Sequence, residues 1–130
     1  MKVLVCGGRD YWRYSRVREE LDKLNLDYRT DLVIEGGCRE RDKDDNCEMG
    51  ADYYANSWAE ENEIPVLTHW APWEKHGGRR KGNPAGPTRN KAMLERWEPD
   101  LVLAFPGGSG TANMVKQARA AGVEVREIDG

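Results

Sequence analysis

The chain has 130 residues, a formal net charge of −3 and a hydrophobic fraction of 38%. This length is enough for one domain with a buried core, so we expect a single domain over residues 1–130. The negative charge disfavours general attraction to nucleic acid or to anionic membranes. No apolar stretch reaches the ~18 residues of a membrane-spanning helix, and the N-terminus lacks signal-peptide features. We therefore expect a cytoplasmic protein without a membrane or nucleic-acid partner.

The three cysteines, Cys6, Cys38 and Cys47, are an odd number without CxxC spacing, which indicates reduced thiols. A zinc site made of Cys38, Cys47 and a histidine is conceivable, but it fits no standard ligand spacing. We expect neither a metal nor another cofactor.

The first half of the chain alternates between strand and helix patterns. Residues 3–6 are apolar and end at a glycine pair, as buried parallel strands often do. Ser15 is expected to cap a helix whose apolar residues recur at helical spacing. Residues 32–34 form a second strand, again followed by two glycines. An apolar stripe over residues 51–59 predicts a second helix.

The second half continues the alternation. Residues 64–67 are a third strand, and their proline predicts an edge position. Thr88 is expected to begin a third helix, and residues 101–105 are a fourth strand. A fourth helix stops at Gly122, and a short alternating segment follows as a final edge strand. We predict an α/β fold with a mostly parallel sheet of about five strands and helices on both faces.

Three of the predicted strands lead into glycine pairs: Gly7 and Gly8, Gly36 and Gly37, and Gly107 and Gly108. Glycine is also common in tight strand-to-helix turns, so one such pair would mean little. The carboxyl ends of parallel strands meet at one edge, and ligands of such sheets bind there. Three converging pairs therefore favour a ligand site.

The most informative stretch is residues 106–111, Pro-Gly-Gly-Ser-Gly-Thr, between the fourth strand and the fourth helix. Glycines let the backbone approach a ligand closely, and the N–H groups at a helix start point at anions. Ser109 and Thr111 add hydroxyl donors. This turn predicts a phosphate-binding loop.

Two charged segments interrupt the pattern. Residues 39–49 form a mixed-charge insert that is either a solvated loop or a lid over the site. Residues 75–87 form a glycine-rich basic loop. Its basic residues suit a clamp on a compact phosphorylated ligand, since the rest of the chain is acidic.

Four motifs occur in order along nearly the whole chain, at residues 2–11, 33–37 resumed at 50–59, 85–93 and 99–113. Together they resemble the YspA-like branch of the SLOG superfamily. The insert at 39–49 splits the second motif and is the departure from the pattern. The resemblance implies a Rossmann-like three-layer sandwich that binds a nucleotide-derived small molecule.

Other SLOG proteins are associated with bacterial conflict systems as sensors of nucleotide signals, and related proteins commonly form dimers. The resemblance therefore implies a protein that senses, carries or sequesters a signalling nucleotide, as a homodimer. Cytokinin-activating phosphoribohydrolases are more distantly similar; they use an arginine, matched here by Arg89, and a glutamate, whose position here is Met114. A thioether cannot transfer a proton, which favours binding over catalysis.

Two alternatives remain. The first is a hydrolase that cleaves an N-glycosidic or phosphodiester bond, with Glu35 or Asp52 as the acid or base. The second is a DNA-binding protein, which the net charge and the lack of a recognition helix disfavour.

In the binding hypothesis, Arg9 and Arg89 pair with phosphate oxygens. Asp10 or Asp52 accepts from ribose hydroxyls, and Tyr11 or Trp12 stacks on a base, although Trp12 equally suits a core-covering role. The predicted ligand-contacting residues are Gly7, Gly8, Arg9, Asp10, Tyr11, Gly36, Gly37, Arg89, Asn90, Gly107, Gly108, Ser109, Gly110 and Thr111.

Overall fold

The structure is a computed structural model that describes residues 1–37, 49–69 and 85–130. Strands and helices alternate along it as the sequence predicts. They are β1 (Lys2–Cys6), α1 (Tyr14–Asp22), β2 (Leu32–Glu35), α2 (Ala51–Glu61), β3 (Val66–Thr68), α3 (Ala85–Trp97), β4 (Leu101–Ala104), α4 (Ser109–Ala120) and β5 (Glu124–Glu127).

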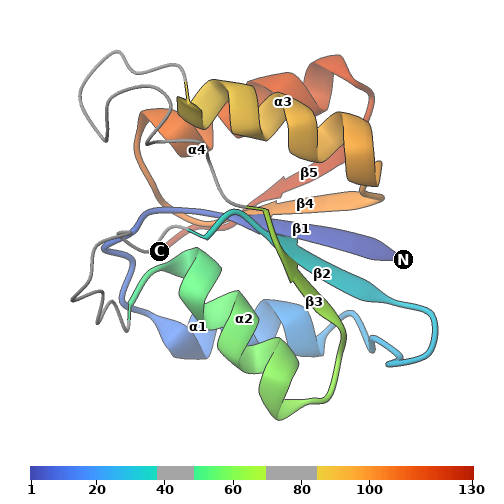
Figure 1. The fold of residues 1–130 in the computed structure, drawn as a ribbon. Helices are drawn as coiled ribbons and strands as arrows, with labels where there is room; N and C mark the ends of the chain where they lie inside the picture. Colours follow the sequence, from blue (N-terminus) through green and yellow to red (C-terminus); the bar gives the residue numbers. More distant parts are fainter. Residues whose placement is uncertain (38–48, 70–84) are drawn as a thin grey trace, which may run out of the picture.

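All five strands pair in parallel, in the order β3-β2-β1-β4-β5 (Figure 1). Val3 of the central strand aligns with Val33 of β2 and with Leu101 of β4. The strand order reverses between β1 and β4, which is where ligands of open α/β sheets bind. The predicted α/β, Rossmann-like fold is confirmed, and β3 lies at the edge as Pro65 predicted.

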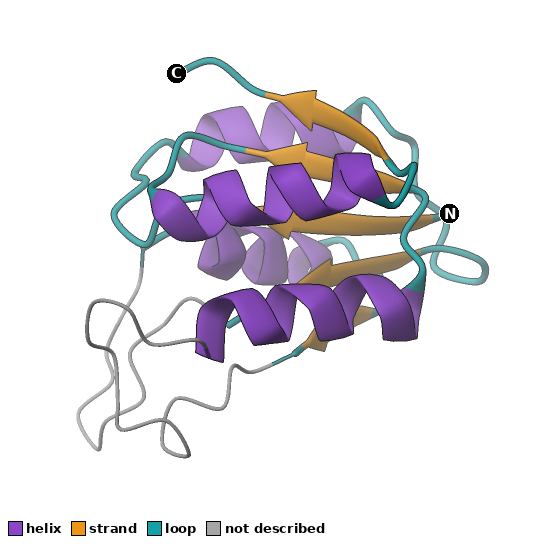
Figure 2. Cartoon of the chain, turned by 90° about the horizontal axis from the view of Figure 1, so that it is seen from above, coloured by secondary structure: helices purple, strands orange, loops and turns teal. Residues whose placement is uncertain are grey.

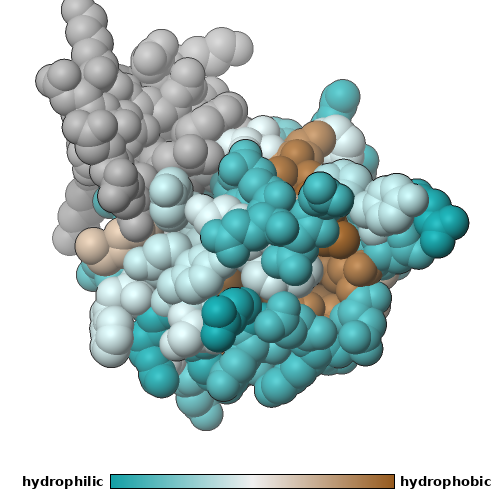
Figure 3. Space-filling view, turned by 90° about the horizontal axis from the view of Figure 1, so that it is seen from below, coloured by the Kyte–Doolittle hydropathy of each residue, from teal (hydrophilic) through white to brown (hydrophobic). Residues whose placement is uncertain are grey.

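Helices α1 and α2 cover one face of the sheet, and α3 and α4 cover the other (Figures 1 and 2). Successive strand residues point to opposite faces, so each strand contributes to two cores. Val3 and Val17 belong to the core under α1 and α2, whereas Leu4 and Met93 belong to the core under α3 and α4. The outer surface on the α1 and α2 side is mostly hydrophilic (Figure 3).

Three helices begin earlier than their sequence signals indicate. Helix α1 begins at Tyr14, so Ser15 lies inside it, and Arg13 makes no side-chain cap bond. Helix α3 begins at Ala85 rather than Thr88, because Pro87 in a first turn needs no backbone N–H. Helix α4 begins at Ser109, so the second half of the glycine turn is the first turn of the helix.

Several predicted features lie wholly or largely outside the described residues. These are the insert, the basic loop, and the two cysteines considered for zinc, Cys38 and Cys47. In the ranges that the structure covers, no helix combines the length and apolarity needed to cross a membrane.

Candidate functional site

The glycine turns after β1 and β4 touch at the carboxyl edge of the sheet. The Gly8 N–H donates to the Pro106 carbonyl at 2.9 Å. A Cβ atom on Gly107 would lie 2.7 Å from the Gly8 nitrogen and 2.2 Å from the Thr111 hydroxyl oxygen, and one on Gly7 would lie 2.5 Å from the Cβ of Ala51. Glycine is therefore required at residues 7 and 107 by the packing of the protein's own turns.

The start of α4 is open. A Cβ atom at Gly108 or Gly110 would meet no atom within 4 Å. The first backbone bond of the helix runs from the Ala112 N–H to the Gly108 carbonyl at 3.1 Å. The N–H groups just before Ala112 therefore have no acceptor within the helix, and this arrangement, with the helix dipole, is of the kind that suits an anion.

A cavity of about 320 Å³ lies beside this turn. Its walls come from the β4–α4 turn, α4 and the segment after β5, and they include Phe105, Gly107, Thr111, Val115, Glu127 and Asp129. The volume is at the lower end of the range for small-molecule sites. The acidic residues of these walls are Glu127, the last residue of β5, whose carboxylate pairs with Arg119 at 2.8 Å, and Asp129.

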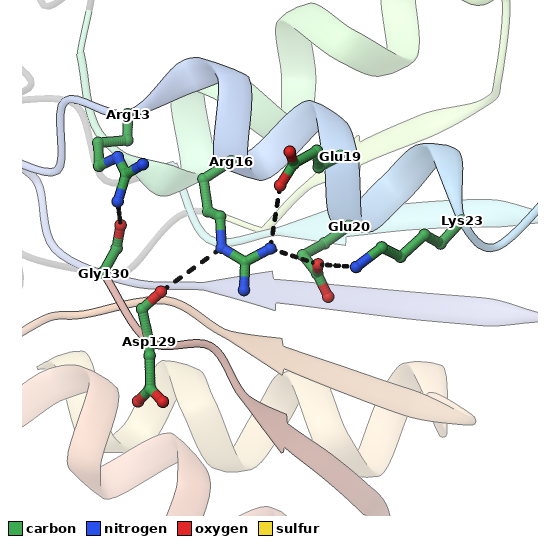
Figure 4. A network of polar contacts seen from close by, with 7 residues as sticks. All are labelled: Arg13, Arg16, Glu19, Glu20, Lys23, Asp129 and Gly130. Atoms are coloured by element: carbon green, nitrogen blue, oxygen red, sulfur yellow. Dashed lines mark hydrogen bonds and ion pairs between the residues drawn. The ribbon is translucent and has the colours of Figure 1, made fainter.

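Two arginines, one just before helix α1 and one within it, hold the segment after β5 in place (Figure 4). Arg13 donates to the Gly130 carbonyl, and the Arg16 Nε lies 3.5 Å from the Asp129 carbonyl oxygen. Arg16 is itself bonded to the carboxylate of Glu20 at 2.7 Å. The Asp129 carboxylate points away from both arginines (Figure 4), so its charge is not paired with them.

Arg89 joins α3 to the end of β2. Its Nη1 donates to the Gly36 carbonyl, and its Nε donates to the Asn90 side-chain oxygen at 3.0 Å. A Cβ atom on Gly36 would lie 2.0 Å from this Nη1. Gly36 leaves room for the Arg89 guanidinium, and its contact with a ligand stays a prediction.

Asn90 extends this connection to α4. It is buried, with 3% exposed, and its Nδ2 donates to the Gly110 carbonyl and to the Asn113 oxygen, each at 3.2 Å. A continuous chain of bonds therefore runs from Gly36 through Arg89 and Asn90 to the first turn of α4.

The family model described as YspA, cpYpsA-related SLOG family matches residues 1–76. The chain belongs to this SLOG family. The match includes the glycine turns after β1 and β2 but ends before α3, so the roles of Arg89 and of the α4 start rest on geometry. No curated protein matches the chain in sequence. Membership in the SLOG family supports a nucleotide-related function in coarse terms.

Both candidate catalytic carboxylates of the SLOG domain bind its backbone. Glu35 is fully buried and accepts from the Gly37 N–H at 2.6 Å, from Asn56 at 3.1 Å and from the Thr68 hydroxyl. Asp52, with 4% exposed, accepts from the Gly36 N–H at 3.1 Å. In this geometry both carboxylates hold the glycine turn after β2.

The two residues predicted to stack on a base, Tyr11 and Trp12, differ in burial in the turn after β1. Tyr11 is buried, its ring centroid lies 5.5 Å from that of Phe105, and in the described part of the chain its hydroxyl has no hydrogen-bond partner. Burial raises the pKa of Tyr11. Trp12, in contrast, is 72% exposed. Arg9 and Asp10 are exposed, and the Asp10 carboxylate lies against its own turn at Gly8.

Met114 is 1% exposed and packs in the core between α4 and the sheet, beside Leu4. It therefore does not reach the open edge of this SLOG domain. The thiol of Cys6, at the end of β1, is partly exposed, and burial and the nearby Asp52 carboxylate raise its pKa. Within the described ranges, no three metal-binding side chains gather in one place.

Sequence reasoning missed one residue at the edge, His69. It directly follows β3, and its Nδ1 accepts from the Trp97 indole N–H at 3.1 Å. Burial, Arg89 and Arg96 lower the pKa of His69. Its position just past a predicted strand was the available signal, because strand ends carry the site residues of parallel sheets.

Proposed function

We propose that the protein binds a nucleotide-derived small molecule at the carboxyl edge of the sheet, and that it senses, carries or sequesters a signalling nucleotide. The ligand phosphate would sit at the start of α4, with the rest of the molecule across the adjoining edge. The supporting observation is the bond chain from Gly36 to Gly110, which attaches a guanidinium to the open helix start.

Arg89 suits the role of phosphate partner. A guanidinium has five N–H donors, and the bonds to Gly36 and Asn90 use two of them. The remaining donors suit phosphate oxygens, and the planar group is held in one orientation before the ligand arrives. This preorganisation lowers the entropic cost of binding.

Binding is favoured over hydrolysis because the candidate acid Glu35 is engaged elsewhere and Met114 stands at the position of the phosphoribohydrolase glutamate. The oxygens of Glu35 accept from three donors, and Met114 is buried away from the edge. A hydrolase would need a carboxyl group able to exchange a proton with the substrate.

The first experiment is native mass spectrometry of the protein purified from cells, to identify a nucleotide that co-purifies. Calorimetric titration with that nucleotide then compares the parent with Gly110→Val. The structure leaves open space around a Cβ at Gly110, so the fold should survive while the added bulk blocks the phosphate. We expect binding to be lost.

Ala120→Val is the matched control, because Ala120 is exposed near the other end of the same helix. It should bind like the parent. Arg89→Ala should weaken binding by on the order of 2–5 kcal/mol, the usual cost of removing one partner of a desolvated charge pair. Unchanged affinity in Gly110→Val would place the phosphate elsewhere and overturn the proposal.

A further inference from the structure

Two donor groups are attached to successive carbonyls at the end of β2. The backbone N–H of His69 donates to the Glu35 carbonyl at 2.8 Å. The Arg89 guanidinium donates to the carbonyl of the next residue, Gly36. His69, which follows β3, and Arg89, which lies on α3, therefore both bind the carboxyl end of β2.

The hydrogen bond from Trp97 fixes the tautomer of His69. An indole N–H can only donate, and it donates to Nδ1 of His69 at 3.1 Å. A nitrogen that accepts carries no proton. The ring is therefore neutral, with its proton on Nε2, and the other nitrogen is a hydrogen-bond donor.

The charges around the ring act in the same direction. Arg89 and Arg96, both on α3, disfavour the imidazolium, as does partial burial. Glu35 is the acidic residue of the adjoining strand, and its oxygens are occupied by Gly37, Asn56 and Thr68.

We propose that His69 is a ligand-contacting residue that donates from Nε2, as a neutral imidazole, to an acceptor oxygen of the bound molecule, and that Trp97 is its positioning residue. The description of the ligand as a nucleotide rests on the proposed function, whereas the tautomer of His69 does not depend on it. A neutral donor on the residue bound to the same strand end as Arg89 adds a hydrogen bond without a second positive charge. It therefore suits a sugar or base oxygen next to the phosphate that Arg89 holds.

The tautomer can be tested without any ligand, by long-range proton–nitrogen correlation NMR on the full chain labelled with ¹⁵N-histidine. At pH 7 we expect one ring with the Nε2–H pattern, assigned by its loss in His69→Gln, with the signal of His76 retained. Trp97→Phe keeps the aromatic bulk but removes the indole N–H, and should shift the ring towards a mixture of tautomers. A protonated or Nδ1–H ring in the parent would overturn the assignment.

The contact is tested by calorimetric titration with AMP. His69→Phe should weaken binding roughly 3- to 10-fold, the usual value of one neutral hydrogen bond. His69→Gln retains an N–H donor and should recover most of that affinity. Parental affinity in His69→Phe, with binding lost in Arg89→Ala, would overturn this inference alone. Absence of AMP binding to the parent would overturn the ligand contact together with nucleotide binding at this edge, while the NMR result would still judge the tautomer.

Discussion

Gly36→Ala separates the position of Arg89 from its charge. The new Cβ would lie 2.0 Å from Nη1 and 2.6 Å from Cζ of Arg89, so the guanidinium must retreat. It must move by roughly 1.5 Å to reach ordinary van der Waals contact, which breaks its bond to the Gly36 carbonyl. A polar group left without its partner costs about 1–3 kcal/mol, and we expect that loss in the free energy of unfolding.

Urea denaturation measures this loss, and titration with the identified nucleotide should show weakening close to that of Arg89→Ala. Gly108→Ala is the matched control, because its Cβ meets no atom within 4 Å and should leave stability nearly unchanged. The decisive test is the double variant. If Gly36 acts through Arg89, adding Gly36→Ala to Arg89→Ala should cost little further stability. An equal cost in both backgrounds would refute the reasoning.

Three further predictions concern titration and the core. The lowered pKa of His69 means that its stabilising contribution is complete above pH 6.5 and is lost as the pH falls through the folded-state value; stability measured from pH 7.5 to 5 should fall less steeply in His69→Gln. Burial and the bond to Glu61 raise the pKa of Tyr14 to about 12, so its contribution is complete below pH 10 and is lost as the pH rises through about 12; ultraviolet titration should show late tyrosinate absorbance, of which Tyr14→Phe removes the part near pH 12, while the late part from buried Tyr11 stays. Met114→Glu restores the glutamate of the phosphoribohydrolase pattern but places it in the core, so chemical denaturation should show a loss of roughly 2–7 kcal/mol, and chromatography should show no base release from nucleoside monophosphates by the variant or the parent.

Strands β1, β2 and β4 were predictable because apolar runs ending at glycines have few alternatives in an α/β chain. The start of α4 was placed three residues late, since glycine and serine at 108–110 were interpreted as a turn although they also suit a first helical turn. The start of α3 was likewise placed too late, at Thr88, although Pro87 also suits a first helical turn.

The site was predictable in location but not in contacts. The sequence placed Gly36 and Arg89 at one edge, yet nothing in it shows that one makes room for the other. Glu35 was selected as an acid because it ends a strand, but the donors that occupy it come from residues 37, 56 and 68. Such pairings are set by the three-dimensional packing of α2, β3 and the turn, which local pattern does not determine.

The central position of β1 has a consequence for how the chain acquires its structure. One side of β1 pairs with β2, about thirty residues along the chain, whereas the other side pairs only with β4, which is much further along. Just before β4, Asp100 forms two hydrogen bonds with Lys2 of β1, of 2.7 and 2.8 Å. The long loop between β1 and β4 must close before the contacts that stabilise it can form, and closing a loop of this length is slow. During synthesis, one edge of the central strand stays unpaired until residues 101–104 emerge, which exposes that edge of the nascent chain to aggregation.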